Sequence, residues 1–385
     1  MAPLVGAGII PREAAEDCLR TWQALLKQDS RVSLLKLMVK KGLLTRTQAL
    51  VLAGAPIESP DRQPFFPNYK LVRRVGEGGM AIVYEATYQK VMSRVALKVL
   101  MTQFCLQETY RLRFKREANI LLNLDHPNIV EGREYDTFDG VDFYAMGYVD
   151  GISVLDILEH GIPIDEGLAL HIAAQVASAL EHMREKGIVH RDIKPGNLVL
   201  DPEGNVKIID FGLAKVMSGM WQDVGTETTV GTIDYMSPEQ ARGETNVDTR
   251  ADVYSLGVTL FHMATGELPF QGTPAEIMYG HVKTEIDFTA KQRAKISPQT
   301  QFILRRTMAK DPAHRYETPK ALLDDIHALC DAIIEGREPV PEVVSKTSVE
   351  AAPIRLPPPR PAGQAPAPPR TRPPFQPRNP PKRHR

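Results

Sequence analysis

One stretch of twelve residues, "VHRDIKPGNLVL" at 189–200, constrains the fold of this chain more than any other feature. A histidine, an arginine, two oppositely charged side chains (Asp192 and Lys194) and Asn197 lie in it between apolar runs. Unpaired charges are costly to bury, so the stretch is not an ordinary pair of core strands. A solvent-exposed loop would not need apolar residues on both sides. The pattern therefore predicts a polar loop that is anchored in the core, with its charges held in fixed positions.

Composition excludes several classes of protein. The 385 residues suffice for one large domain with a small one attached, and 43% apolar and 24% charged residues are typical of a globular protein. The 47 basic residues balance 47 acidic ones, so nothing favours nucleic acid or an anionic membrane as a partner. We expect neither a membrane span nor a secretory signal. Three distant cysteines (Cys18, Cys105 and Cys330) argue against disulfides or a zinc site and favour a cytoplasmic location.

The chain divides into regions of different composition. Residues 1–55 have helical periodicity, with Gly42 as a predicted helix C-cap and Thr45 as the N-cap of a last short helix. A Pro-containing linker covers 56–68, and the main domain covers 69–331. Residues 337–385 are rich in Pro and Arg and poor in large apolar residues, so we expect this tail to be disordered.

Within the main domain, strands come before helices. The β-like runs are 69–75, 82–88, 94–100 and 142–149, with one helix predicted between them at 114–124. Helices dominate after Gly151, at 168–186 and 252–265. This order predicts an α+β protein with a small β-rich lobe beside a larger helical lobe.

The segment "VGEGGMAIVYEA" at 75–86 places Gly76, Gly78 and Gly79 in a turn between two strands. Glycines let a backbone approach phosphate oxygens closely and present N–H donors to them. A plain glycine-rich hairpin would have the same pattern. A strand follows the loop and no Gly-Lys-Ser/Thr ends it, so neither a dinucleotide fingerprint nor a Walker loop fits.

Lys98 lies in the strand "RVALKVL", where alternation puts it on the face opposite Val95, Leu97 and Val99. A lysine on a buried strand needs a counter-ion. We expect this partner to be Glu117, which borders the apolar stripe of a helix. That stripe consists of Phe114, Ala118, Leu121 and Leu122.

These motifs together match the protein-kinase signature. The residues that carry the match are His190, Arg191, Asp192, Lys194, Pro195, Asn197, Asp210, Phe211 and Gly212. Residues 69–331 resemble a Hanks-type serine/threonine protein kinase, and "GEGGMA" and "GTIDYMSPEQA" resemble the bacterial members. The resemblance implies a bilobal protein-kinase fold with a β-rich N-lobe and a helical C-lobe, preceded here by the short helical module.

The resemblance also implies the chemistry, which is transfer of the γ-phosphoryl group of ATP to protein hydroxyls. Asp192 would accept the proton of the substrate hydroxyl, and Lys194 would offset charge on the moving group. Lys98, locked by Glu117, would grip the phosphates. Asn197 and Asp210 would hold Mg²⁺, or Mn²⁺ in its place.

The residues expected to contact ATP come from the small lobe, the hinge and one strand of the large lobe. Met146 resembles the gatekeeper, and the hinge follows it at 147–149. The full set is Val75, Gly76, Glu77, Gly78, Gly79, Met80, Ala81, Val83, Ala96, Lys98, Met146, Val149 and Val199.

Other positions refine the prediction. Lys194 and Thr232 resemble the serine/threonine branch, and the resemblance implies that Glu239 pairs with Arg315 and that Asp252 anchors the catalytic loop. Ala81 replaces a third loop glycine, Ser237 replaces the usual alanine before Pro-Glu, and Gly147 replaces a hinge acid. A pseudokinase scaffold and a nucleotide-binding module without transfer remain as alternatives, although the latter would not require Asp192 and Lys194.

Three threonines between the two signature motifs, Thr226, Thr228 and Thr229, are candidate phosphorylation sites. A phosphate there would pair with Arg191 and order the segment. We expect autophosphorylation, with a dimer as the arrangement that would allow it. A polar loop with incidental threonines is the alternative.

The flanking regions suggest partners other than ATP and protein substrates. Residues 1–55 resemble short helical modules before some bacterial kinase domains and would serve as an interaction module or as a small cap. The tail contains "RLPPPRP" at 355–361, which would suit a partner that binds polyproline II. A solvated basic linker is the other interpretation of the tail.

Overall fold

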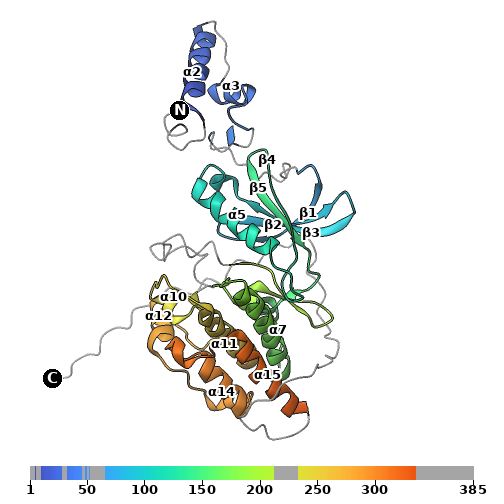
Figure 1. The fold of residues 1–385 in the computed structure, drawn as a ribbon, viewed down its shortest axis with the longest axis vertical. Helices are drawn as coiled ribbons and strands as arrows, with labels where there is room; N and C mark the ends of the chain where they lie inside the picture. The colour runs from blue at the N-terminus through green and yellow to red at the C-terminus, as the bar shows by residue number, and fades with distance from the viewer. Residues whose placement is uncertain are drawn as a thin grey trace, which may run out of the picture.

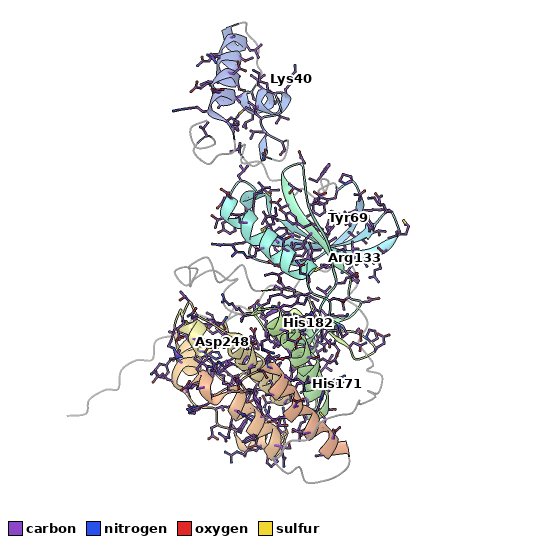
Figure 2. The ribbon with its side chains drawn as sticks, viewed as in Figure 1. Lys40, Tyr69, Arg133, His171, His182 and Asp248 are labelled. Carbon is purple, nitrogen blue, oxygen red and sulfur yellow. The ribbon has the colours of Figure 1, made fainter. Side chains whose placement is uncertain are left out.

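The computed structural model describes Val5, residues 10–27, 33–45, 48–49, Leu52, 66–211 and 233–334. Figure 1 shows a small group of helices at one end, a twisted sheet with one helix on it in the middle, and a helical lobe at the other end. In Figure 2 the labelled side chains mark these three parts: Lys40 in the first, Tyr69 and Arg133 in the second, and His171, His182 and Asp248 in the third.

The N-terminal helices are α2 (Arg12–Lys27) and α3 (Leu34–Lys40). Ser33 begins α3 by accepting a hydrogen bond from the backbone N–H of Lys36, and Gly42, with φ of +68°, follows the helix end. The predicted glycine cap is thus confirmed, because only a residue that tolerates the left-handed region fits there. The buried side chains of this part are Ile10, Ala15, Cys18, Leu37, Met38 and Leu44.

The N-lobe is a five-stranded antiparallel sheet in the order β1-β2-β3-β5-β4. Its strands are β1 (Tyr69–Glu77), β2 (Ala81–Tyr88), β3 (Ser93–Leu100), β4 (Gly132–Phe138) and β5 (Val141–Gly147). Four of them were predicted. Their alternation or apolar content is strong, whereas β4, "GREYDTF", is only partly buried and gives no such signal.

Helix α5 (Glu108–Leu122) follows the short 3₁₀ turn η1 (Thr102–Phe104) and packs on β4 and β5. Phe114, Glu117, Ala118 and Leu121 are its buried residues. The prediction that Leu122 belongs to this stripe is wrong, because Leu122 is the last helical residue and is 36% exposed. The buried residues of α5 recur at i, i+3, i+4 and i+7 from Phe114, and Leu122 at i+8 lies at the edge of that face.

The C-lobe contains a small antiparallel sheet of β6 (Ile152–Ser153), β7 (Leu198–Leu200) and β8 (Val206–Ile208). Its long helices are α7 (Glu166–Glu185), α11 (Thr249–Thr265) and α15 (Pro319–Ile334), and α7 packs against both of the others. The shorter elements are α6 (Val154–Glu159), η2 (Pro195–Asn197), α10 (Pro238–Ala241), α12 (Pro274–Lys283), α13 (Ala290–Arg293), α14 (Pro298–Thr307) and η4 (Pro312–His314).

Backbone contacts join the lobes. Val130 N–H, just before β4, donates to the carbonyl of Ile208 in β8 at 3.0 Å. Gly151, after β5, lies so close to the backbone of Leu200 that a Cβ would collide with it. The end of the N-lobe sheet therefore meets the β7–β8 hairpin, which carries the predicted motifs at its two ends.

Among the helices that the structure describes, none could cross a membrane.

Candidate active site

Lys98 of β3 and Glu117 of α5 form the ion pair that the sequence predicted. Lys98 Nζ lies 2.6 Å from Glu117 Oε1, and the two side chains are 9% and 1% exposed. Tyr144 of β5 is the register partner of Lys98, and its hydroxyl donates to the same Glu117 oxygen at 2.7 Å. The structure therefore shows a second hydrogen bond to Glu117, which the sequence analysis did not predict. Tyr144 lies two residues before Met146 on the same face of β5, and this position could have indicated its role.

Burial controls the protonation of this pair. It raises the pKa of Glu117 to about 7, against the opposing charge of Lys98. Burial alone would lower the pKa of Lys98, but the carboxylates of Asp210 and Glu117 outweigh it and raise that pKa well above its usual value. Lys98 is therefore a permanent cation at the boundary between the lobes.

Asp210 stands two residues after β8 and reaches the same lysine. Lys98 Nζ donates to Asp210 Oδ1 at 2.5 Å, and the Asp210 side chain is 45% exposed. An N-lobe cation and a C-lobe carboxylate thus meet directly, and the carboxylate keeps an accessible side.

The catalytic-loop motif lies next to Asp210. The N–H of Ile209 donates to the carbonyl of Asn197 at 3.0 Å. Asn197 Nδ2 donates to Asp192 Oδ2 at 3.0 Å, and Lys194 Nζ lies 3.1 Å from the same oxygen. Lys98 thus contacts Asp210, the backbone of the preceding Ile209 is bonded to Asn197, and Asn197 and Lys194 both contact Asp192. The sequence places these residues up to 112 positions apart.

A buried carboxylate holds this loop in shape. Asp252 of α11 is 1% exposed and accepts the backbone N–H groups of His190 and Arg191 at 2.8 and 2.7 Å, as predicted. Burial raises the pKa of Asp252 to about 7. Arg191 has a φ of +68°, which is strained for a residue with a side chain. Gln240 Nε2, a contact not predicted, donates to the Arg191 carbonyl at 2.9 Å and helps to fix that conformation.

The glycine-rich loop connects β1 to β2. The N–H of Gly78 donates to the carbonyl of Ala81 at 2.8 Å, so the turn is a closed hairpin. A Cβ placed on Gly76 would meet no atom within 4 Å among the described residues. Packing therefore does not require glycine at Gly76, and the space beside it is open to a ligand. Val75, Glu77 and Gly79 of the same loop are exposed and Met80 is half-buried.

The apolar residues predicted around adenine come from both lobes. Ala96 of β3 is paired in register with Met146 of β5, and the two are 8% and 4% exposed. Val83 is the register partner of Lys98 on its other side. Val199 of β7 is 9% exposed and its side chain lies beside Gly151, just after the hinge residue Val149. The structure thus brings these predicted residues to the same boundary as Lys98.

Asn197 and Asp210 fit a magnesium site. Asn197 bonds to Asp192 through its amide nitrogen, so its oxygen is the atom suited to a cation, and Asp210 offers a half-exposed carboxylate. Mg²⁺ is held by one or two protein oxygens together with water and substrate phosphates. Within the described residues, no group of three His, Cys, Asp or Glu side chains could hold an ion by itself. The donor set thus suits an ion that the nucleotide phosphates help to bind.

Glu239 and Arg315 form the buried pair that was predicted. Arg315 Nη1 and Nη2 donate to the two carboxylate oxygens at 2.7 and 2.9 Å, and the side chains are 0% and 5% exposed. The same guanidinium also donates to the carbonyls of Ala309, Arg250 and Lys310. Ser237, which replaces alanine in the motif, is the N-cap of α10 in a reciprocal pair with Gln240. This departure therefore has a structural role.

Several predicted residues lie outside the described part of the chain. They are Gly212, Thr226, Thr228, Thr229 and Thr232.

Comparison with known families agrees with this geometry. Residues 69–325 match the protein kinase domain family. The chain belongs to the protein kinase family. Its described lobes are similar to the kinase domain of PknI from Mycobacterium tuberculosis, with a TM-score of 0.54 and 29% identity over 69% of this chain and 96% of that one.

Two curated relatives extend the comparison. PknB of Mycolicibacterium smegmatis, a serine/threonine-protein kinase, is 36% identical over 77% of this chain and 50% of its own length. PrkC of Bacillus subtilis, also a serine/threonine-protein kinase, is 36% identical over 69% of this chain and 41% of its own length. The chain therefore spans half or less of the length of these relatives.

Proposed function

We propose that this protein is a serine/threonine protein kinase that transfers the γ-phosphoryl group of ATP to protein hydroxyls. The observation that supports this most is the cluster in which Lys98 contacts Asp210, the backbone of Ile209 bonds to Asn197, and Asn197 and Lys194 contact Asp192. Phosphoryl transfer needs positioned charge more than covalent chemistry, and this cluster supplies both signs of charge at one place.

Each residue has one role in the proposal. Lys98, held by Glu117 and Tyr144, binds the α- and β-phosphates. Asp192 orients the attacking hydroxyl and accepts its proton, and Lys194 neutralises charge on the transferring group. Asn197 and Asp210 hold Mg²⁺, with Mn²⁺ as a substitute. The ion supplies a Lewis acid that offsets the charge developing on the phosphate oxygens.

Nucleotide binding would change the partners of two charged groups. Lys98 and Asp210 bind each other in the structure at 2.5 Å. The phosphates are the stronger partner for the lysine, and Asp210 is then turned toward the cation. We infer that this exchange, rather than folding of new structure, assembles the nucleotide site.

The proposal extends to activation. The Nε of Arg191 is buried, and no group among the described residues accepts its proton. A phosphate on Thr226, Thr228 or Thr229 would provide a charged acceptor for this guanidinium. Autophosphorylation, the dimer that would carry it out and the cytoplasmic location stay predictions from the sequence.

Transfer of labelled phosphate from ATP to a generic protein substrate tests the proposal. We expect Asp192→Asn to lower kcat at least 100-fold with little change in nucleotide affinity, because Asp192 acts on the hydroxyl and not on ATP. Equal transfer by wild type and Asp192→Asn would overturn the mechanism. Nucleotide binding without transfer by the wild type would favour the binding-module alternative, and the absence of both would favour a pseudokinase.

A further inference from the structure

The turn between β4 and β5 is covered by the N-terminal part of the chain. Asp139 and Gly140 form this two-residue turn, with φ of 49° and 77°. A Cβ on Gly140 would lie 3.0 Å from Thr45 Oγ1 and 3.3 Å from side-chain carbons of Gln48. The N-terminal helices indeed stand beyond this end of the sheet in Figure 1. Gly140 therefore leaves just enough room for the segment that follows α3.

The two residues that touch the turn, Thr45 and Gln48, are bonded to each other. Gln48 N–H donates to Thr45 Oγ1 at 3.1 Å, and Thr45 N–H donates to Gln48 Oε1 at 2.8 Å. Such a reciprocal pair fixes both side chains at a helix start. Leu44, the residue before Thr45, is buried in the core of the N-terminal helices. The contacting surface is therefore continuous with that core.

A second contact lies on the other side of the connector. Phe66 is 1% exposed, and its ring centroid is 4.6 Å from that of Phe143 and 6.5 Å from that of Phe138. Phe138 precedes the turn and Phe143 follows it. The chain thus touches the same hairpin at Thr45 and Gln48 and again at Phe66, on either side of the connector.

The hairpin is joined in turn to α5. Asp142, two residues after Gly140, is completely buried. Its carboxylate accepts Arg111 Nε of α5 at 2.6 Å and Arg111 Nη2 at 3.1 Å, and also the hydroxyls of Tyr135 and Thr137 at 2.9 and 2.5 Å. Arg111 is 43% exposed, but the Asp142 carboxylate is fully buried and would lose two of its four hydrogen bonds without that guanidinium. The pair therefore ties the hairpin to the helix. Helix α5 also carries Glu117.

We propose that the N-terminal helices dock on the β4–β5 turn through Thr45 and Gln48 and, by way of the Asp142–Arg111 pair, fix the position of α5. The occupant of this N-lobe surface is thus a segment of the same chain. The docking is independent of the proposed kinase activity, because it is defined by contacts away from the ATP-contacting residues.

Hydrogen exchange on the full chain tests the proposal without any assay of phosphoryl transfer. The test variant is Gly140→Asn, since asparagine tolerates positive φ but adds a side chain against Thr45 and Gln48. The matched control is Gly161→Asn, where φ is +67° and a Cβ would meet nothing within 4 Å. We expect amide exchange in both α3 and α5 to become about tenfold faster in Gly140→Asn and to stay unchanged in the control.

Two further variants separate the steps. Asp142→Asn should speed exchange in α5 and leave α3 unchanged, because it breaks the link beyond the docking contact. Gln48→Ala weakens the contact from the module's side, and it tests docking even if Gly140→Asn does not fold. Unchanged exchange in α3 for both Gly140→Asn and Gln48→Ala would overturn docking. Faster exchange in α3 with α5 unaffected would overturn the coupling.

Discussion

At the scale of single residues, Glu117 combines deep burial with two hydrogen bonds to one oxygen. Its carboxylate is 1% exposed and accepts hydrogen bonds from both Lys98 and Tyr144. Removing its charge leaves the lysine paired with Asp210 alone, in a place where a charge is expensive to keep. Lys98 would then stay bound to Asp210, although the proposed site needs Lys98 for the phosphates and Asp210 for the metal ion.

We expect Glu117→Gln to lower kcat/KM by about 100-fold, since Lys98 is then held by Asp210 alone and is misplaced relative to the phosphates. Tyr144→Phe is the matched variant, because it removes one neutral donor from the same oxygen. Its loss should be about fivefold, which corresponds to about 1 kcal/mol for one hydrogen bond. Steady-state kinetics with ATP as the varied substrate measures both, and equal losses would show that the ion pair contributes no more than the tyrosine bond does.

At the scale of elements, the C-lobe depends on the close approach of α11 to α14. A Cβ on Gly257 of α11 would come within 2.7 Å of Thr307 Cβ and 3.0 Å of Met308 Cγ. The two helices can therefore be this close only because one of them carries glycine at the contact. A second helical glycine, Gly167 of α7, has only Asp165 Oδ1 nearby, at 3.4 Å.

These two glycines should respond to alanine with opposite signs. Gly257→Ala forces the helices apart, and we expect it to lower the free energy of unfolding by about 1–3 kcal/mol. Gly167→Ala keeps the packing and improves helix propensity, so it should raise that free energy by up to about 1 kcal/mol. Urea unfolding of the two variants beside the wild type measures the difference. Stabilisation by Gly257→Ala would contradict the proposed packing.

The individual elements also show how much of the structure could be predicted from the sequence. The pairing of Lys98 with Glu117 was predicted correctly because a buried charge needs a counter-ion. Strand β4 was missed because its letters are mostly polar and half-exposed, although Asp139 and Gly140 are a local signal for the hairpin. The contact of Asp142 with Arg111 joins residues 31 positions apart, and no periodicity in either segment points to it.

At the scale of the whole molecule, the hinge is fixed to the N-lobe by charge. Glu85 of β2 is 8% exposed and accepts Arg73 Nε at 2.8 Å and Arg94 Nε at 3.1 Å. Arg73 also donates to the hydroxyl of Tyr148, and Arg94 stacks over its ring at 4.2 Å and reaches Asp150. Side chains from β1, β2 and β3 therefore hold the segment that joins the lobes at Tyr148 and Asp150. The exposed Asp150 end of this network contributes little, since surface ion pairs are weak.

Global stability should also depend on pH through a buried histidine. His281 of α12 contacts the Tyr254 hydroxyl of α11 at 3.0 Å and the Asp234 carbonyl at 3.1 Å. Burial lowers the pKa of His281 to about 3, and the charge of Lys310 adds to this effect. The unfolded chain takes up this proton near the ordinary value of 6.5, whereas the folded protein does not. The stabilisation is therefore complete above pH 6.5 and is lost as the pH falls toward 3.

We expect His281 to account for about 2 kcal/mol of the stability lost between pH 7 and pH 5, at about 1.4 kcal/mol per pH unit below 6.5. His281→Gln should be less stable than the wild type at pH 7 and should show a flatter dependence on pH over this range. Chemical unfolding at pH 7, 6 and 5 measures the slopes. Parallel slopes for the two proteins would rule out this role for the histidine.

The pairing of Glu239 with Arg315 limits how this protein can diverge. Losing either residue leaves a buried charge without a partner, which lowers the free energy of unfolding by about 3–5 kcal/mol. The whole free energy of unfolding of a typical protein is only about 5–15 kcal/mol. Exchanging both at once does not help, because the backbone carbonyls that accept from Arg315 would then face a carboxylate. Every single-step mutational path away from this pair therefore crosses a poorly folding intermediate, and descendants of this chain are expected to retain both residues while the surface around them drifts.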